Sequence, residues 1–343
     1  MAKADILIVH LNGEDIIKQC LGSIKKNTKD ADIYLLLNNS QDKSENIVRK
    51  KFPKVKIYKT DKTIGFAESC NILAKEAKSR YLIFLNNDTI VGKNWLDEMI
   101  KTVEKHKNCV ACQPKIKSFF HKEDFEYAGA AGGFIDRYGY PFCRGRIFNI
   151  IEKDKGQYND EMRIFWGCGV CLLVNRNFFL KSGGFDEDFF MYAEELDFCW
   201  RTNLYSKEIW FAPKSEIYHI GSYTTKQSNL SIKNAKKDYF ITRNHLLALI
   251  KNYSFIELTK ILPLRIFFEI VAAIRFAPIR TLSFAKIFIS MPWIYISKFH
   301  KKRSFIQKNR KASDNKLKSL ISKKSIVVEH FLKGKDKFNE IFN

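Results

Sequence analysis

The chain lacks any hydrophobic run long enough to cross a bilayer. A spanning helix needs about 20 consecutive apolar residues, whereas the longest apolar region, residues 254–297, is interrupted by charged residues and prolines. A secretory signal is also missing, because the apolar run at residues 6–9 is short and polar side chains follow it. We therefore expect residues 6–9 to form a first strand and the protein to face the cytosol.

Acidic residues are scarce relative to basic ones: 37 Asp and Glu stand against 59 Lys and Arg, a net charge of +22. This excess predicts a polyanionic partner, which could be nucleic acid, an anionic membrane surface or a nucleotide-linked substrate. No recognised nucleic-acid-binding motif is present, and the basic residues concentrate near the C-terminus beside apolar segments. We expect no nucleic-acid partner, with a basic nucleic-acid-binding protein as the alternative from another functional class.

Eight cysteines in a long chain without a secretory signal indicate reduced thiols. Two pairs, Cys109/Cys112 and Cys168/Cys171, have the spacing of zinc ligands, but both lie in apolar, strand-like sequence. Side chains three positions apart on a strand point to opposite faces, whereas zinc ligands converge from turns. We expect small buried hydrophobes, with a four-cysteine zinc site as the alternative.

Strand and helix patterns alternate in the first half of the chain, and a glycine-rich segment and a further apolar run follow. Short apolar runs predict strands, and apolar residues at helical spacing predict the helices between them. The expected strands are residues 6–9, 33–37, 55–58, 81–85 and 165–174, the expected helices are residues 15–26, 44–51 and 67–78, and residues 127–145 form a glycine-rich insertion. Strands separated by single helices predict an α/β fold with a mostly parallel sheet flanked by helices.

Polar turns follow two of the expected strands. Asn38 to Ser40 comes after residues 33–37, and Asn86 to Asp88 comes after residues 81–85. Ligands of parallel sheets gather beyond the carboxyl ends of the strands, so we expect both turns to line one crevice. Asp88 could hold a cation there. A turn aspartate that caps the next helix is the alternative interpretation.

The most informative stretch is residues 183–201, where Glu194, Glu195 and Asp197 lie among large apolar side chains. Burying charge in such surroundings is unfavourable unless the charge is used. We expect residues 193–205 to form a helix whose start favours ionised carboxylates, while burial raises a carboxyl pKa toward the range of a general base. A solvated acidic helix face is the alternative.

Residues 246–343 have a different composition. Pro263, Pro278 and Pro292 are expected to cut the apolar part into short helices, and residues 298–343 carry 14 basic and 4 acidic residues, a net charge of +10. Such helices suit an anionic membrane surface, with the apolar face down. We expect a membrane-associated amphipathic helical region after a catalytic domain at residues 1–245, with a soluble helical cap as the alternative.

The motifs as a set resemble the family 2 glycosyltransferases of the GT-A fold, and especially their bacterial rhamnosyltransferase-like branch. The resemblance covers about residues 5–225. It is carried, in order, by residues 8–12, 38–40, Gly65 to Ala67 with Asn71, Leu85 to Thr89, Gly183 to Glu187, Tyr192 to Asp197 with Arg201, and His219 to Ser222. The resemblance implies an inverting transfer of a sugar, with rhamnose a candidate, from a dTDP- or UDP-linked donor to a hydroxyl.

The resemblance also implies roles for individual residues. Asp88 matches the last acidic residue of the family's DxD-like motif, which holds Mg²⁺ or Mn²⁺, and His219 matches a late histidine that contacts the metal or the diphosphate. A hydrogen-bonded core histidine is the alternative for His219. Glu195 stands where the family carries its base, usually Asp, so Glu194 is the alternative base. Asp197 would orient the acceptor or pair with Arg201.

Donor binding is expected along the same crevice. Leu37 stands where the family often has an Asp for the nucleotide, so Asn38 or Ser40 would supply the polar contacts, or Asp42 or Asp61 would substitute. The remaining donor-site residues are expected to be His10, Asn12, Gly65, Asn71, Asn86 and Asn87. The acceptor would be a glycan or a lipid-linked molecule of cell-surface glycan synthesis, reached at the cytoplasmic face of the membrane. A catalytically silent scaffold and a sugar-nucleotide hydrolase are further alternatives.

Overall fold

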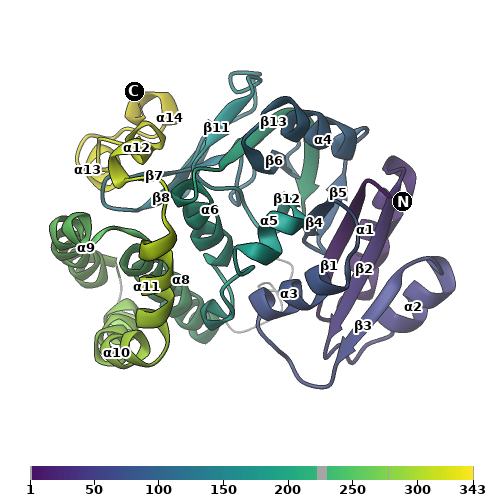
Figure 1. Cartoon of the computed structure of the whole chain (residues 1–343), viewed down its shortest axis with the longest axis horizontal. Helices are drawn as coiled ribbons and strands as arrows, with labels where there is room; N and C mark the ends of the chain where they lie inside the picture. The colour runs from purple at the N-terminus through teal and green to yellow at the C-terminus, as the bar shows by residue number, and fades with distance from the viewer. Residues whose placement is uncertain (1, 222–229, 277, 343) are drawn as a thin grey trace.

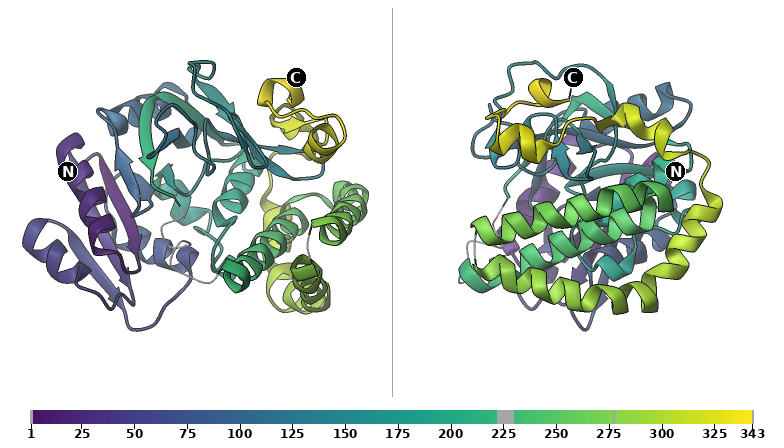
Figure 2. Two further views of the ribbon diagram at one scale, coloured as in Figure 1. Left: turned by 180° about the vertical axis from the view of Figure 1, so that it is seen from behind. Right: turned by 90° about the vertical axis from the view of Figure 1, so that its left-hand side faces the viewer.

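A nine-stranded mixed sheet forms the centre of the part of the chain that the computed structural model describes, residues 2–221, 230–276 and 278–342 (Figure 1). The strand order is β11-β13-β6-β12-β4-β1-β2-β3, and β5 pairs with β13. Helices cover both faces of the sheet, and the C-terminal helices pack beyond one end of it (Figures 1 and 2). This is the α/β architecture that the alternating pattern predicts.

The first quarter of the chain follows the predicted order closely. The elements are β1 (Ala4–His10), α1 (Glu14–Asn27), β2 (Ala31–Asn38), α2 (Ser44–Lys51), β3 (Lys56–Thr60), α3 (Phe66–Glu76) and β4 (Tyr81–Leu85). β1 pairs in parallel with β2 and β4, and β2 pairs in parallel with β3. β1, β2 and β4 are mostly buried because helices cover both faces, which is why their sequences contain continuous apolar runs, whereas β3 at the sheet edge is partly exposed.

The second part of the sheet is mixed in direction. It contains β5 (Thr89–Val91), β6 (Cys109–Ser118), β11 (Met162–Ile164), β12 (Cys171–Asn175) and β13 (Glu208–His219), with helix α4 (Trp95–Lys105) between β5 and β6. β12 runs antiparallel to both β4 and β6, whereas β13 runs parallel to β6. The prediction of one strand over residues 165–174 is wrong in its first half. Cys171 N donates to Cys168 O at 3.2 Å, so a glycine-containing turn precedes β12.

A second, smaller sheet joins the glycine-rich insertion to the end of the chain. Its strands are β7 (Gly133–Asp136), β8 (Pro141–Cys143), β9 (Arg146–Ile147), β10 (Ile150–Ile151) and β14 (Ile321–Ser322). β14 pairs in parallel with β7. The buried Asp136 carboxylate accepts from the main-chain nitrogens of Tyr138, Tyr140 and Ile326. The C-terminal residues therefore complete a sheet that begins near residue 133.

The carboxylate segment and the C-terminal region are helical. After α5 (Arg176–Lys181) and η1 (Glu187–Phe189), α6 (Glu194–Leu204) confirms the helix predicted at residues 193–205. The later elements are α8 (Leu230–Asn252), α9 (Phe255–Phe276), α10 (Pro278–Ile294), η2 (Tyr295–Phe299), α11 (His300–Asn309), α12 (Asp314–Leu317), η3 (Lys318–Leu320), α13 (Ile326–Phe331) and α14 (Phe338–Ile341). Helices α8 to α11 lie against one another on one side of the molecule (Figure 2, right).

The prediction that three prolines divide the apolar region into short helices is wrong for two of them. Pro263 lies inside α9 and Pro292 inside α10, whereas Pro278 begins α10. Packing between neighbouring helices keeps the segments helical despite the hydrogen bonds that proline removes. Among the described residues, no helix has the length and apolar character that a membrane crossing requires. The expected domain boundary at residues 245 and 246 falls within α8.

All eight cysteines are free and buried, as the apolar surroundings of both Cys-x-x-Cys pairs predict. Burial raises the pKa of the Cys112, Cys168 and Cys171 thiols well above the usual value, and it raises that of Cys109 to about 12. A metal ligand has to be a thiolate, so these surroundings favour the interpretation as small buried hydrophobes.

Candidate active site

The first wall of the site is built where β1, β2 and β4 end. His10, the last residue of β1, is fully buried, and its ring lies 2.9 Å from Ser44 Oγ and 2.8 Å from Asn87 Nδ2. Burial lowers the His10 pKa to about 4, against the opposing charge of Asp42, so the ring is neutral. With no exposed surface, His10 positions Asn87 and the start of α2. The predicted role of His10 in donor binding would therefore act through Asn87 and the start of α2.

Asn12 and Ser40 join the first two of these strand ends. Ser40 Oγ donates to His10 O at 3.1 Å and accepts from Asn12 N at 3.2 Å. Asn12 Oδ1 accepts from Gln41 N at 2.8 Å, and the Asn12 side chain is exposed at the edge of the sheet. Asn12 and Ser40 therefore lie together where the sequence places a donor.

The Asn38 side chain forms its hydrogen bonds with other residues of the protein. Its side-chain amide donates to Ile64 O at 2.9 Å, and its oxygen accepts from Ile64 N at 2.9 Å and from Thr60 Oγ1 at 3.2 Å. The side chain is buried. Asn38 therefore ties the end of β2 to the loop before α3, and it shapes the crevice from behind.

Gly65 and Asn71 hold the loop that leads into α6. A side chain at Gly65 would place its Cβ 2.8 Å from Phe190 O, so this glycine admits the Phe190 main chain. The buried Asn71 side chain donates to Phe185 O at 2.8 Å and to Glu187 Oε1 at 3.0 Å, and it accepts from Phe185 N at 3.0 Å. Both were predicted to line the donor crevice, and their observed contacts are with the segment of residues 185–190 that precedes α6.

Asp88 and His219 form the predicted pair at the edge of the sheet. Asp88 Oδ1 lies 3.1 Å from His219 Nε2, and His219 Nδ1 lies 3.6 Å from Glu126 Oε1. Burial opposes protonation of the ring, but the carboxylates of Asp88 and Glu126 raise the His219 pKa to about 9. Within the described residues, Asp88 Oδ1 and both ring nitrogens are buried without an aligned hydrogen bond.

These atoms fit a divalent cation. A carboxylate oxygen and an imidazole nitrogen are buried, unpaired by hydrogen bonds and close together, which is the donor set that Mn²⁺ accepts. Asn86 and Asn87 lie in the same turn, and Glu126 is a further oxygen donor that the sequence did not indicate. Ser222, the last residue of the His219 motif, lies outside the described residues.

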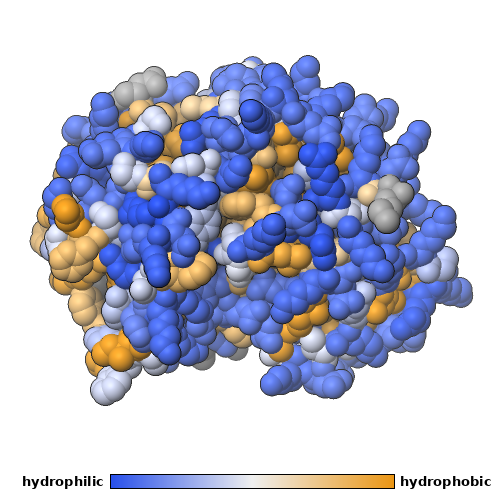
Figure 3. Space-filling view, viewed as in Figure 1, coloured by the Kyte–Doolittle hydropathy of each residue, from blue (hydrophilic) through white to orange (hydrophobic). Residues whose placement is uncertain are grey.

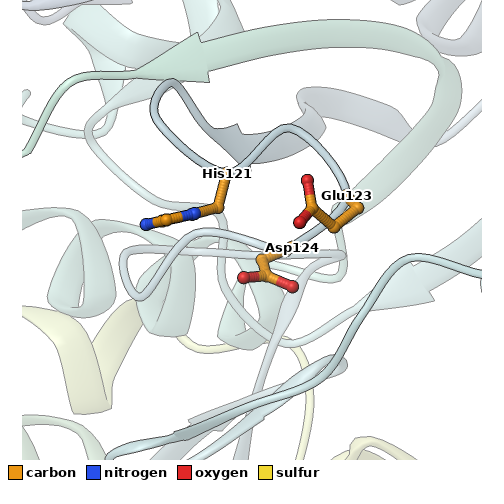
Figure 4. A group of neighbouring side chains, drawn as sticks. All are labelled: His121, Glu123 and Asp124. Carbon is orange, nitrogen blue, oxygen red and sulfur yellow. The ribbon is translucent and has the colours of Figure 1, made fainter.

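Another group of possible metal ligands lies on the loop after β6. His121, Glu123 and Asp124 have ligand atoms within 4.8 Å of one another, the only such group of three among residues 2–221, 230–276 and 278–342 (Figure 4). His121 and Glu123 are exposed, and Asp124 is partly exposed. Exposed acidic groups of this kind occur commonly without an ion. A substitution in this loop therefore serves as the control for a substitution at Asp88.

The second wall carries two neighbouring carboxyl groups, on the buried Glu194 and the half-buried Glu195. Glu194 is 4% exposed. In the described part of the chain, the Oε2 atoms of Glu194 and Glu195 are both buried without a hydrogen-bond partner. Burial raises the pKa of both, and the neighbouring Glu195 charge raises that of Glu194 further. The interpretation as a solvated acidic face is wrong. The arrangement suits a proton acceptor that holds its proton more tightly than an ordinary glutamate.

The two walls meet at the turn before β12. Asn86 N donates to Val170 O at 3.0 Å, which places the turn containing Asp88 against this segment. The neighbouring residue, Gly169, faces Glu195: a Cβ built on Gly169 would lie 3.8 Å from the Glu195 carboxyl carbon. One short stretch of main chain therefore touches both the expected metal turn and the carboxyl pair.

Asp197 has a different environment from its two neighbours. It is fully buried and accepts from Arg201 Nε at 2.9 Å, Lys251 Nζ at 2.8 Å and Asn252 Nδ2 at 2.8 Å. Burial alone would raise its pKa, but the charges of Lys251 and Arg201 lower it. The predicted pairing with Arg201 is present. Of the two roles predicted for Asp197, orienting the acceptor or pairing with Arg201, the contacts favour the second, and we assign Asp197 as a positioning residue.

The family model of glycosyl transferase family 2 matches residues 5–181, just over half of the chain. The chain belongs to glycosyl transferase family 2. This assignment confirms the resemblance carried by the motifs and identifies the chain as a glycosyltransferase. The matched region includes Asp88 but ends before the Glu194–Glu195 pair and His219, so their roles depend on the geometry above.

Relatives of this family 2 chain include enzymes of surface glycan synthesis. The chain is 24% identical over 231 residues to the rhamnosyltransferase WbbL of Escherichia coli, covering 64% of this chain and 84% of that protein. It is 23% identical over 234 residues to an N-acetylglucosaminyl-diphospho-decaprenol L-rhamnosyltransferase of Mycobacterium tuberculosis (62% and 75%). It is also 23% identical over 223 residues to the O-antigen biosynthesis protein RfbC of Myxococcus xanthus (63%), but spans only 17% of that longer protein.

Solved glycosyltransferases share the fold. The mannosyltransferase PcManGT of Pyrobaculum calidifontis, in complex with GDP-Man and Mn²⁺, is similar with a TM-score of 0.53 and 12% identity, over 90% of this chain and 86% of that one. TarS of S. aureus is similar with a TM-score of 0.54 and 13% identity, over 97% and 92%. At this identity the likeness shows the fold, which confirms the expected GT-A architecture.

This family 2 chain departs from the usual pattern in its nucleotide wall. Leu37 replaces the expected Asp, and Asp42 and Asp61 are the two predicted substitutes. Only Asp42 has its carboxylate bound to main-chain nitrogens. Asp42 accepts from Gly13 N at 2.7 Å and from Ser44 N at 3.1 Å, whereas Asp61 is exposed on the loop after β3. Asp61 is thus the better placed of the two to meet a ligand.

Proposed function

We propose that this family 2 enzyme is an inverting glycosyltransferase that moves a sugar, rhamnose being the first candidate, from a nucleoside diphosphate to a hydroxyl. The acceptor would be a lipid-linked or polysaccharide molecule of cell-surface glycan synthesis. The observation that carries the proposal is the Glu194–Glu195 pair, whose Oε2 atoms are buried without a hydrogen-bond partner among the described residues. The short turn before β12 contacts both this pair and the Asp88 segment. The two rhamnosyltransferase relatives support the choice of sugar.

Asp88 and His219 would hold Mg²⁺ or Mn²⁺, with Glu126 close by. When bound, the cation supplies positive charge that stabilises the diphosphate as it leaves. We assign the binding of the nucleotide and phosphates to four polar residues: Asn12, Ser40, Asp61 and Asn86. A dTDP- or UDP-linked donor would fit this wall. Asn87 then acts through its bond with His10, which fixes the turn.

Inversion requires a base on the side of the sugar opposite the leaving group. Glu195, with Glu194 as the alternative, takes the proton from the acceptor hydroxyl. As that oxygen bonds to the anomeric carbon, the bond from this carbon to the diphosphate oxygen breaks, and the diphosphate leaves with the electron pair. Burial favours the protonated carboxyl, so the transfer of the proton to Glu195 is easier than to an exposed glutamate.

The C-terminal helices supply a surface for peripheral attachment to the cytoplasmic face of the membrane. On α9 the exposed apolar residues Phe267, Ile270, Val271 and Ile274 share one helical face, and on α10 and η2 the residues Ile289, Trp293 and Ile296 share another. Apolar surface gathers over the part of Figure 3 where Figure 1 places α9 and α10. With Lys286, Lys298 and Lys301 exposed nearby, this surface suits anionic lipid.

A thermal-shift screen of nucleotide sugars with Mn²⁺ tests the proposal first, because a bound ligand stabilises the folded protein by mass action. We expect a dTDP- or UDP-linked sugar to raise the melting temperature, and EDTA to remove the rise. The selected donor is then tested for transfer to a diphospholipid-linked sugar. Salt-sensitive retention on DNA, with no response to any nucleotide sugar, would favour the nucleic-acid-binding alternative.

A further inference from the structure

We propose that α8 and α11 position the candidate base, so that the C-terminal helices are a working part of the active site as well as a membrane-facing surface. The inference rests on the proposed function, because it assigns a role to residues around Glu194 and Glu195. It is carried by a set of buried contacts that hold the main chain on both sides of this pair.

The chain enters α6 through an unusual turn. Phe190, Tyr192 and Ala193 have φ values of 65°, 67° and 64°, a left-handed region that residues with a side chain rarely adopt. Ala193 is the residue directly before Glu194. Such conformations persist only where the surrounding structure holds them, and they cluster at functional sites. The direction in which the carboxyl pair points is therefore set by whatever holds this turn.

Asn244 of α8 holds the turn that leads into α6. This side chain is fully buried, and its Nδ2 donates to the carbonyl oxygens of Phe189 at 3.0 Å, Met191 at 2.8 Å and Tyr192 at 2.7 Å. The neighbouring Arg243 donates to Phe189 O at 3.0 Å. An amide that contacts three carbonyl oxygens of one turn fixes its shape more directly than packing alone.

Charged contacts hold the segments before and after the turn. Lys251 of α8 pairs with Asp186 at 2.5 Å and with Asp197 at 2.8 Å, and it is 2% exposed. Asp186 precedes the turn, and Asp197 lies one helical turn after Ala193, so one ammonium group joins both sides. Lys302 of α11 contacts Asp186 and, at 2.6 Å, Asp188.

These contacts reach the base from helices that begin after residue 229. Asn244 and Lys251 are buried against the segment around the turn, and Lys302 pairs with Asp186 and Asp188 before it, so we assign each an effect through the turn. We therefore name Asn244, Lys251 and Lys302 positioning residues. Their loss is expected to change the rate of transfer more than the binding of the donor, because the donor contacts lie on the opposite wall.

The test uses the full chain with Asn244→Asp, which keeps the shape of the side chain but removes its donated hydrogen bonds at neutral pH. We expect kcat to fall by about 10- to 100-fold, since a misplacement near 1 Å has effects of that order. The donor KM should stay within about twofold. Amide hydrogen exchange at residues 189–195 should become faster. Asn309→Asp, at an exposed asparagine of α11, is the matched control and should leave all three unchanged.

Lys302→Gln tests the same inference if Asn244→Asp does not fold, because Lys302 is 38% exposed and its loss leaves the core intact. We expect kcat to fall about 3- to 30-fold at unchanged donor KM, with Lys308→Gln on the same helix as control. An active wild type whose Asn244 and Lys302 variants keep kcat within twofold overturns this inference alone. A wild type that binds donor and Mn²⁺ but transfers to no acceptor overturns the base assignment and this inference together.

Discussion

His219 Nε2 lies 3.1 Å from Asp88 Oδ1, so the last residue of β13 meets the turn that follows β4. Neither atom has an aligned hydrogen bond within the described residues. Although burial opposes protonation, without a cation the Asp88 and Glu126 carboxylates hold the His219 ring in its protonated form, since they raise its pKa to about 9. A cation bound by the same atoms would take the place of that proton. This pair is therefore the structural basis for expecting a cation at the edge of the sheet.

Replacement of Asp88 by Asn tests the cation site directly. The side chain keeps its shape but loses its charge, so we expect Mn²⁺-dependent affinity for UDP or dTDP to fall by at least about tenfold, or 1.4 kcal/mol. Isothermal titration with and without EDTA measures the change. Asp124→Asn, in the exposed loop of Figure 4, is the control and should have no effect. Equal affinity of wild type and Asp88→Asn would remove the metal role.

Glu195→Gln should separate binding from transfer. We expect kcat to fall by about 10²- to 10⁴-fold, the usual contribution of a general base, while the donor dissociation constant stays unchanged. Glu194→Gln is the matched comparison, because both carboxyl groups are buried and lack a partner for Oε2 in the described part of the chain. If Glu195→Gln remains active and Glu194→Gln does not, the base is Glu194.

The pH profile should show the raised pKa of the pair. A base works when deprotonated, so kcat should fall as the pH drops through the raised pKa, which lies above the ordinary value of 4.5. Burial is the cause that raises the Glu195 pKa, so Glu194→Gln should leave this limb above pH 4.5 if Glu195 is the base. Cys70, Cys168 and Tyr192 also face the pair, but their pKa values are raised from 9 and 10, above this range. A limb at or below pH 4.5 in both proteins would contradict the assignment.

Lys251→Met should destabilise the fold by up to about 3–5 kcal/mol, because it breaks two buried ion pairs at once. Among the described residues, Asp186 then keeps only Lys302 as a charged partner, and Asp197 keeps only Arg201. Asp186 and Asp197 have pKa values lowered by Lys251, despite burial, so their contribution to stability is present above pH 3.8 and is lost as the pH falls through the lowered values. Urea unfolding at pH 7 and pH 3 measures both effects. Lys260→Met, on the surface of α9, should change stability by less than about 1 kcal/mol.

The double replacement Ile289→Ser and Trp293→Ser should weaken binding to anionic vesicles by at least about tenfold, since each side chain is 75% exposed and would be buried in lipid. Sedimentation with vesicles measures the binding, and thermal unfolding should be unchanged. Leu332→Ser, at another exposed apolar residue, is the control. Equal sedimentation of all three proteins would refute the membrane surface.

Deletion of residues 246–343 is a poor test because it also removes Lys251 and Asn252 from the site.

The sequence predicts local structure well where one pattern dominates. Residues 44–51 and 81–85 have the predicted bounds as α2 and β4, because helical spacing and a continuous apolar run each lead to one answer. The same reasoning fails at Pro263 and Pro292, where contacts between C-terminal helices stabilise a helix that the local sequence disfavours.

The sequence identifies the chemistry of the site but not the partners of each polar group. Asp88, His219 and the Glu194–Glu195 pair could be found because carboxylates and histidines in apolar surroundings imply a use. Asn71 was placed near the donor, whereas its partner is Phe185, 114 residues away. Asn244 has no local pattern that distinguishes it from any other helical asparagine, and only the folded chain brings it to the turn before α6.

Anomalous diffraction from crystals grown with Mn²⁺ and the selected nucleotide sugar tests the central claim most directly. The account predicts one manganese peak bonded to Asp88 and His219, with the anomeric carbon of the sugar turned toward Glu194 and Glu195. A manganese peak at His121, Glu123 and Asp124 instead, or a sugar bound away from the carboxyl pair, would contradict it.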